Sequence, residues 1–163
     1  MRKLILLISI LVASYSLNIK NNSWFVGLSG GTLDIYSSKS LANLKIGYYF
    51  YDPNSYNVNN RIYLDMNYID SSADFYITNL KIDWIKNNEL FSPFVGLSVG
   101  YIYYNENDND YSTTAWGING GLLINITSSI NFELSASWQK AMQKKDVWNK
   151  NIRSLEGGII LNF

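Results

Sequence analysis

Seven charged residues stand at alternating positions within apolar segments, and they are the side chains best placed for chemistry. They are Lys45, Arg61, Asp65, Lys81, Asp83, Glu133 and Glu156. The chain contains no His and no Cys, which removes the commonest general base, thiolate nucleophiles and the usual zinc ligands. We therefore expect no metal and no cofactor. The chemistry that remains for these side chains is ion pairing.

The composition restricts the domain count and the class of partner. A chain of 163 residues fits one domain. Its 13 Lys and Arg balance its 13 Asp and Glu, so it lacks the basic face that nucleic-acid binding requires. We expect no nucleic-acid partner. The unusual feature is the 15% aromatic content, which needs a structural explanation.

The first sixteen residues have the three parts of a secretory signal peptide. Arg2 and Lys3 precede an apolar run over residues 4–12, and the small residues Ser14 and Ser16 follow it. Cleavage after Ser16 would leave residues 17–163 as a single domain with 11 basic and 13 acidic residues. No later segment reaches the roughly 18 consecutive apolar residues of a spanning helix.

Period-two alternation of apolar and polar residues dominates from Trp24 onward and predicts β-strands. We predict eight of them, over residues 24–31, 41–51, 60–69, 73–85, 92–104, 112–126, 129–140 and 152–163. Clusters of turn-forming residues separate them, such as residues 105–110. An even number of strands allows a sheet to close without an exposed edge.

One face of each predicted strand is apolar and the other is polar, small or charged, which fits either a soluble barrel or sandwich or a membrane barrel. The aromatic residues on the apolar face decide for the membrane barrel, because they gather at the two ends of the strands, as interfacial girdles do. The periplasmic girdle would hold Trp24, Tyr48, Phe50, Trp84 and Phe163, and the outer girdle Tyr68, Tyr76, Tyr101, Tyr103, Trp116 and Trp138.

Three segments carry a resemblance to a known family: Trp24 to Leu28, Ser92 to Tyr101 and Gly157 to Phe163. In them the chain resembles the small eight-stranded outer-membrane barrels of Gram-negative bacteria, namely the outer-membrane protein A transmembrane domain, outer-membrane protein X and the opacity-type surface antigens. The resemblance implies an all-β, antiparallel, up-and-down transmembrane β-barrel in the bacterial outer membrane. It also implies that Ile159, Leu161 and Phe163 form the signal read by the barrel assembly machinery.

The charged residues would then face the lumen. Pairing of neighbouring strands places Lys45 opposite Asp65, Asp65 near Lys81, and Arg61 near Asp83, while Glu133 and Glu156 face each other. Such a row of alternating charge is either a packed polar plug or the lining of a gated, porin-like channel. We favour the plug, because eight strands leave a lumen that side chains just fill.

The interpretation that follows is a surface protein with a role in envelope integrity, adhesion or recognition, and a small channel as the alternative. Recognition of a host or neighbouring surface would use the loops over residues 32–40, 105–111 and 141–151. Lys144, Lys145 and Arg153 would contact lipopolysaccharide phosphates, or else belong to an ordinary exposed loop. We expect no enzymatic activity, because the small barrels with deacylase or palmitoyltransferase activity that this chain resembles in size depend on a histidine.

Overall fold

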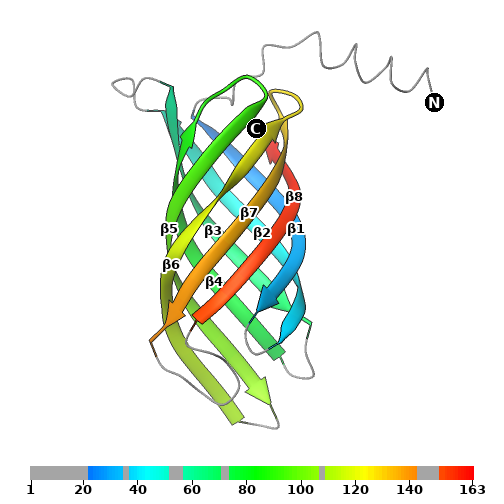
Figure 1. Ribbon diagram of the computed structural model, residues 1–163, viewed down its shortest axis with the longest axis vertical. Helices are drawn as coiled ribbons and strands as arrows, with labels where there is room; N and C mark the ends of the chain where they lie inside the picture. Colours follow the sequence, from blue (N-terminus) through cyan, green and yellow to red (C-terminus); the bar gives the residue numbers. More distant parts are fainter. Residues whose placement is uncertain (1–21, 35–36, 52–56, 71–73, 107–108, 143–150) are drawn as a thin grey trace, which may run out of the picture.

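The described residues form a closed barrel of eight antiparallel strands (Figure 1). The computed structural model describes residues 22–34, 37–51, 57–70, 74–106, 109–142 and 151–163, so the predicted signal peptide over residues 1–16 lies outside them. The strands are β1 (Ser23–Asp34), β2 (Ser38–Tyr51), β3 (Val58–Ile69), β4 (Asp74–Lys86), β5 (Phe91–Glu106), β6 (Asn109–Asn125), β7 (Ile130–Ala141) and β8 (Asn151–Asn162).

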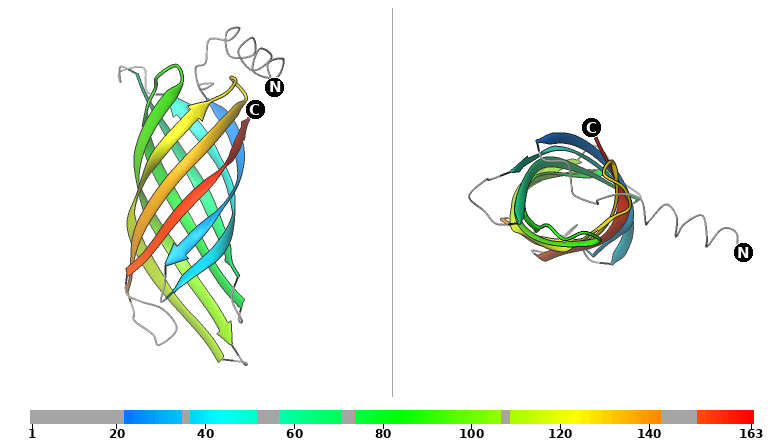
Figure 2. Two further views of the ribbon diagram at one scale, coloured as in Figure 1. Left: turned by 45° about the vertical axis from the view of Figure 1, so that its right-hand side comes forward. Right: turned by 90° about the horizontal axis from the view of Figure 1, so that it is seen from above.

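Each strand pairs with the next along the chain, and β1 pairs with β8 to close the ring (Figure 2). The predicted all-β, eight-stranded, up-and-down barrel is therefore confirmed. The first described residues and the C-terminus lie at one end, which we call the terminal end, and the last residues of β1, β3, β5 and β7 lie at the other, the loop end. Across the described ranges, no helix is long and apolar enough to cross a membrane.

Two predicted loops at the loop end are wrong, because strands occupy most of them. The loop predicted over residues 32–40 shrinks, since β1 runs to Asp34 and β2 begins at Ser38. The loop predicted over residues 105–111 is mostly strand, because Asn105 pairs in register with Asp110. There the Asn105 amide and the Tyr103 hydroxyl, the latter at 2.9 Å, donate hydrogen bonds to the Asp110 carboxylate. The β5–β6 hairpin consequently projects beyond the other strands at the loop end (Figure 1).

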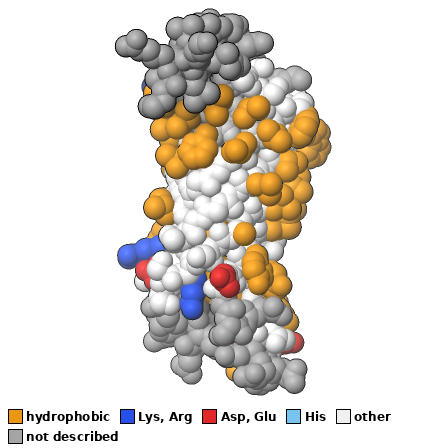
Figure 3. Space-filling view, turned by 90° about the vertical axis from the view of Figure 1, so that its right-hand side faces the viewer, with side chains coloured by type: hydrophobic (Ala, Val, Ile, Leu, Met, Phe, Trp, Pro, Cys, Tyr) orange, Lys and Arg blue, Asp and Glu red, His pale blue; other side chains and the backbone are white. Residues whose placement is uncertain are grey.

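Apolar side chains cover the outside of the barrel (Figure 3). Leu28 is 66% exposed and Trp24 63% exposed, whereas their chain neighbour Phe25 is fully buried inside. All eleven residues of the two predicted girdles lie on the outward face of their strands and are exposed or half-buried. Near the terminal end the Trp24 and Tyr48 rings lie 5.2 Å apart, and toward the loop end the Trp116 and Trp138 rings lie 6.4 Å apart.

Two consecutive glycines in β1 show how closely the wall is packed on its inner side. A Cβ built on Gly31, which points inward, would collide with the backbone of β8 at Leu155 and Glu156. A Cβ built on Gly30, which points outward, would meet only the Leu41 carbonyl oxygen, at an ordinary 3.6 Å. The glycine at position 31 is thus required by the approach of β8, whereas the glycine at position 30 is not.

We predict that Gly31→Ala destabilises the barrel by about 1–3 kcal/mol, the usual cost of overpacking, while Gly30→Ala changes the free energy of unfolding by less than about 0.5 kcal/mol. Urea unfolding in lipid vesicles, followed by tryptophan fluorescence, measures both. Equal unfolding midpoints for the two variants would contradict the inner-wall packing.

Candidate functional site in the barrel lumen

Most of the inward side chains are arranged in three layers along the barrel, and a belt of buried Asn and Ser side chains lies beyond the third layer at the terminal end. Strand β2 shows the order, because its inward residues run from Leu41 at the loop end through Asn43 and Lys45 to Tyr49 at the terminal end. The first layer is apolar, the middle layer polar and charged, and the third apolar and aromatic. The site is therefore a charge network held between two apolar layers.

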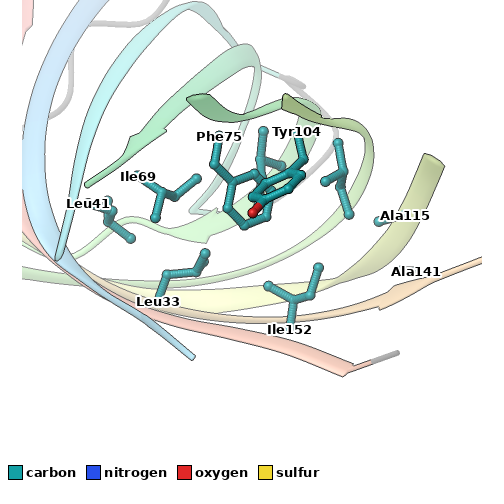
Figure 4. Packing of buried hydrophobic residues seen from close by; sticks show 10 residues of the cluster. Leu33, Leu41, Ile69, Phe75, Tyr104, Ala115, Ala141 and Ile152 are labelled. Carbon is teal, nitrogen blue, oxygen red and sulfur yellow. The ribbon is translucent and has the colours of Figure 1, made fainter. Parts of the chain in front are cut away.

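The apolar layer at the loop end, which we call the loop-end cluster, receives a residue from every strand (Figure 4). Its members are Leu33, Leu41, Ile69, Phe75, Ile77, Ile102, Tyr104, Ala115, Ala141 and Ile152. The opposite layer, the terminal-end cluster, comprises Phe25, Tyr49, Tyr63, Ile85, Phe94, Leu123 and Ile160. Because these side chains are buried and come from around the ring, they fill the lumen on both sides of the charges.

Arg61 is the centre of the charge network and is 0% exposed. Its guanidinium lies 2.7 Å from the Asp83 carboxylate and, through its other terminal nitrogen, 2.7 Å from Glu133. The same group lies over the rings of Tyr63 and Phe94, at 4.7 Å and 4.5 Å from their centroids. The two nearby carboxylates and the two aromatic rings compensate the guanidinium for its lost hydration.

Lys45 connects its own strand to two strands with which that strand does not pair. The register pairs Lys45 with Asp65, as the sequence predicts, but its ammonium points across the lumen to Glu133 of β7, at 2.5 Å, and Glu156 of β8, at 3.2 Å. The expected face-to-face pairing of Glu133 with Glu156 is wrong, because Glu133 stands opposite Gly158. A shared cation between the two carboxylates relieves the repulsion that a direct pair would create.

Asp65 forms an ion pair with Lys81 of the neighbouring strand, as predicted, and the Lys81 ammonium lies 2.7 Å from its carboxylate. The network thus has three cations and four carboxylates. Neutral donors stabilise the additional negative charge: the Tyr63 hydroxyl and Asn119 amide donate to Asp83, at 3.1 Å and 2.7 Å. Further donors reach Asp65 from Asn67 and Asn79, and Glu156 from Ser29 and Ser154.

These neutral partners are the residues that the sequence reasoning missed. Gln139 belongs to the same group, since its amide donates to Asn79 at 2.7 Å and to Ser98 at 3.2 Å. All of them occupy the strand positions with the same parity as the charged residues, so the period-two pattern contains the signal. The inward aromatics Phe25, Tyr49 and Phe94 carry that parity too.

The arrangement is suited to holding strands together. Every carboxylate of the network has a cation within 3.2 Å and is at most 4% exposed, which leaves none of them open to a substrate. In the part of the chain that the structure describes, no group of three His, Cys, Asp or Glu side chains is placed to hold a metal ion.

The other predicted site residues lie on the outside or beyond the described ranges. Ile159, Leu161 and Phe163 point outward at the end of the chain and are exposed. Arg153 is exposed at the loop end, where it stands opposite Asp34 in register, while Lys144 and Lys145 fall outside the described residues. The roles of these residues in assembly and in lipopolysaccharide contact stay predictions.

No known protein-family model matches the sequence, and no curated protein is detectably similar to it. Solved structures are similar in fold. The N-terminal β-barrel domain of Pseudomonas aeruginosa OprF has a TM-score of 0.68 and 17% identity, over 88% of this chain and 98% of that domain. Ail, the attachment invasion locus protein of Yersinia pestis, has a TM-score of 0.55 and 17% identity, and the match covers 88% of this chain and 100% of Ail. The outer membrane enzyme PagL has a TM-score of 0.59 and 11% identity, and the match covers 84% of this chain and 98% of PagL.

These likenesses show that the chain has the fold of the small eight-stranded outer-membrane barrels. At identities of 11–17% they show the fold alone. A domain of a larger protein, an attachment protein and an enzyme share the architecture, so activity has to be argued from the residues of this chain.

We predict that Arg61→Met lowers the free energy of unfolding by about 3–5 kcal/mol, because it leaves Asp83 and Glu133 buried without their shared cation. Arg153→Met, which removes an exposed arginine from the same barrel, is the matched control and should change stability by less than about 0.5 kcal/mol. Urea unfolding in vesicles measures both, and a wild-type midpoint for Arg61→Met would refute the network's structural role.

Proposed function

We propose that this chain is an outer-membrane β-barrel with a structural or surface-recognition role, closed to ions and without enzymatic activity. The observation that carries the proposal is the inversion of polarity between its two faces. Arg61 is 0% exposed inside, whereas Leu28, on the outer wall, is 66% exposed. A water-soluble barrel gains stability by the opposite arrangement, and an apolar outer band is what a bilayer solvates.

The closed state of the barrel is supported by the filling of its lumen. Both apolar clusters lie across the path that an ion would take, and the charges between them are bound to one another. Moving an ion through either cluster would require it to shed its water without replacement ligands. The charged lumen is the one observation that favours a small channel as the second candidate.

The absence of enzymatic activity is supported by the side chains available. PagL is an enzyme on the same fold, but the present sequence has no His and no Cys, and its buried carboxylates are held by cations. Hydrolysis of a lipid ester would need an activated nucleophile or a general base near the surface. The residues of this chain favour recognition over catalysis.

We predict that cell fractionation recovers the protein with the outer membrane, and that the purified protein gives no stable single-channel steps in planar bilayers. Lys45→Ala and Asp65→Ala should be equally silent, because both apolar clusters remain in place. Recovery in the soluble fraction would refute the membrane assignment. Steady conductance steps that change in either variant would instead support the channel.

Recognition would take place at the loop end. The β5–β6 hairpin extends furthest there (Figure 1) and carries the exposed Asp110, which accepts a hydrogen bond from the Tyr103 hydroxyl. The exposed Arg153 at the same end, with Lys144 and Lys145, would bind lipopolysaccharide phosphates through charge-assisted contacts.

We predict that replacing Lys144, Lys145 and Arg153 together by Gln makes cells more sensitive to chelators and detergents, because phosphates of the outer leaflet lose a cationic partner. Lys39→Gln, an exposed lysine at the same end, is the matched control and should leave sensitivity unchanged. Wild-type sensitivity of the triple variant would contradict the contact.

A further inference from the structure

The outer wall is hollowed where β7, β8 and β1 run side by side. The hollow is a groove of about 780 Å³ with an almost wholly apolar lining. Its floor is formed by Gly30 and Gly157, and its sides by larger residues such as Leu28, Phe132 and Ile159. We call it the β8 groove. On the side of the molecule shown in Figure 3, a white strip separates apolar regions of the wall.

The groove exists because two outward-facing glycines stand opposite each other. Gly30 of β1 pairs in register with Gly157 of β8, and the next outward pair toward the terminal end, Leu28 with Ile159, is large. Neither glycine has a positive φ. A Cβ would meet its nearest neighbour at 3.6 Å at position 30 and at 3.4 Å at position 157, which is ordinary contact. The fold therefore does not require glycine at either position, and their effect is to keep the wall hollow.

The lining determines what can occupy the groove. Strand β8 is paired with β7 on one side and β1 on the other throughout this region, so its backbone has no free edge to offer an added peptide strand. A second copy related by a two-fold axis through the groove would place groove against groove and leave both empty. A flexible apolar chain fills such a space with no demand for hydrogen bonds.

We propose that the β8 groove binds one acyl chain of a phospholipid in the leaflet at the terminal end of the barrel. The assignment rests on the proposed function, which places this wall in a bilayer. The groove begins at Val26 and Leu161, two residues from the exposed rings of Trp24 and Phe163. Aromatic rings at that position mark the level of the lipid headgroups. From Val26 to Gly30 it runs about 13 Å along β1 at ~3.3 Å per residue, from near these rings toward the middle of the wall.

The test uses native mass spectrometry after refolding into vesicles of 1-palmitoyl-2-oleoyl-phosphatidylethanolamine and extraction into detergent. The wild type is expected to retain one lipid at an activation energy that removes the others. Gly157→Leu and Gly30→Leu fill the groove from its floor, and each should lower the retained fraction at least about fivefold. Ala136→Leu adds the same bulk to the outer face of β7 away from the groove and should retain the lipid as the wild type does.

Equal retention by all four proteins, or an equal loss in Ala136→Leu, would overturn the assignment. A wild-type dimer that Gly157→Leu abolishes would assign the groove to a second copy instead. Failure of the wild type to insert into the vesicles at all would overturn the membrane-barrel proposal, and the groove assignment with it. Insertion of each variant is verified by its heat-dependent shift in electrophoretic mobility.

Discussion

The inner side chains of eight strands have to fill the space that the strands enclose, and this requirement governs the interior of the barrel. Water cannot hydrate charges there, because an apolar cluster lies on either side of them. The network therefore satisfies its ions internally: Arg61 is held by Asp83 and Glu133, and Lys45 by Glu156 and the same Glu133. These contacts join β2, β3, β4, β7 and β8 across the lumen, which no backbone ladder between neighbours does.

The same network fixes the register of the sheet. Side chains alternate between the two faces, so a slip of one residue would turn every inward charge out toward the apolar surroundings. Such a slip would move the Arg61 side chain to the outward position that Ile62 now occupies. It would lose its contacts with two carboxylates and two aromatic rings. The penalty for a wrong register is therefore much larger than the loss of a few backbone hydrogen bonds. Buried charge here specifies the structure more than it adds to its stability.

Most of the fold could be predicted from the sequence because the relevant information is local. Alternation along a strand assigns each residue to a face, and pairing across a connection follows from its length, so the contact of Lys81 with Asp65 could be anticipated. The residues that bind Lys45 could not, because Glu133 lies 88 positions further along the chain. The loop prediction for residues 105–110 was wrong for a different reason. Their composition favours a turn, but Asn105 and Asp110 bind each other across two extended strands.

A filled lumen also leaves the outside of the barrel as the part that is open to partners. The attachment protein and the enzyme that share the architecture show that the wall alone specifies neither activity. Because the interior side chains bind one another and hold the strands together, any function of this chain that involves a partner has to arise on its outer surface. The β5–β6 hairpin provides one such surface, since two strands continue beyond the rim. The β8 groove provides another, because Gly30 and Gly157 are free of the steric need for glycine that holds at Gly31.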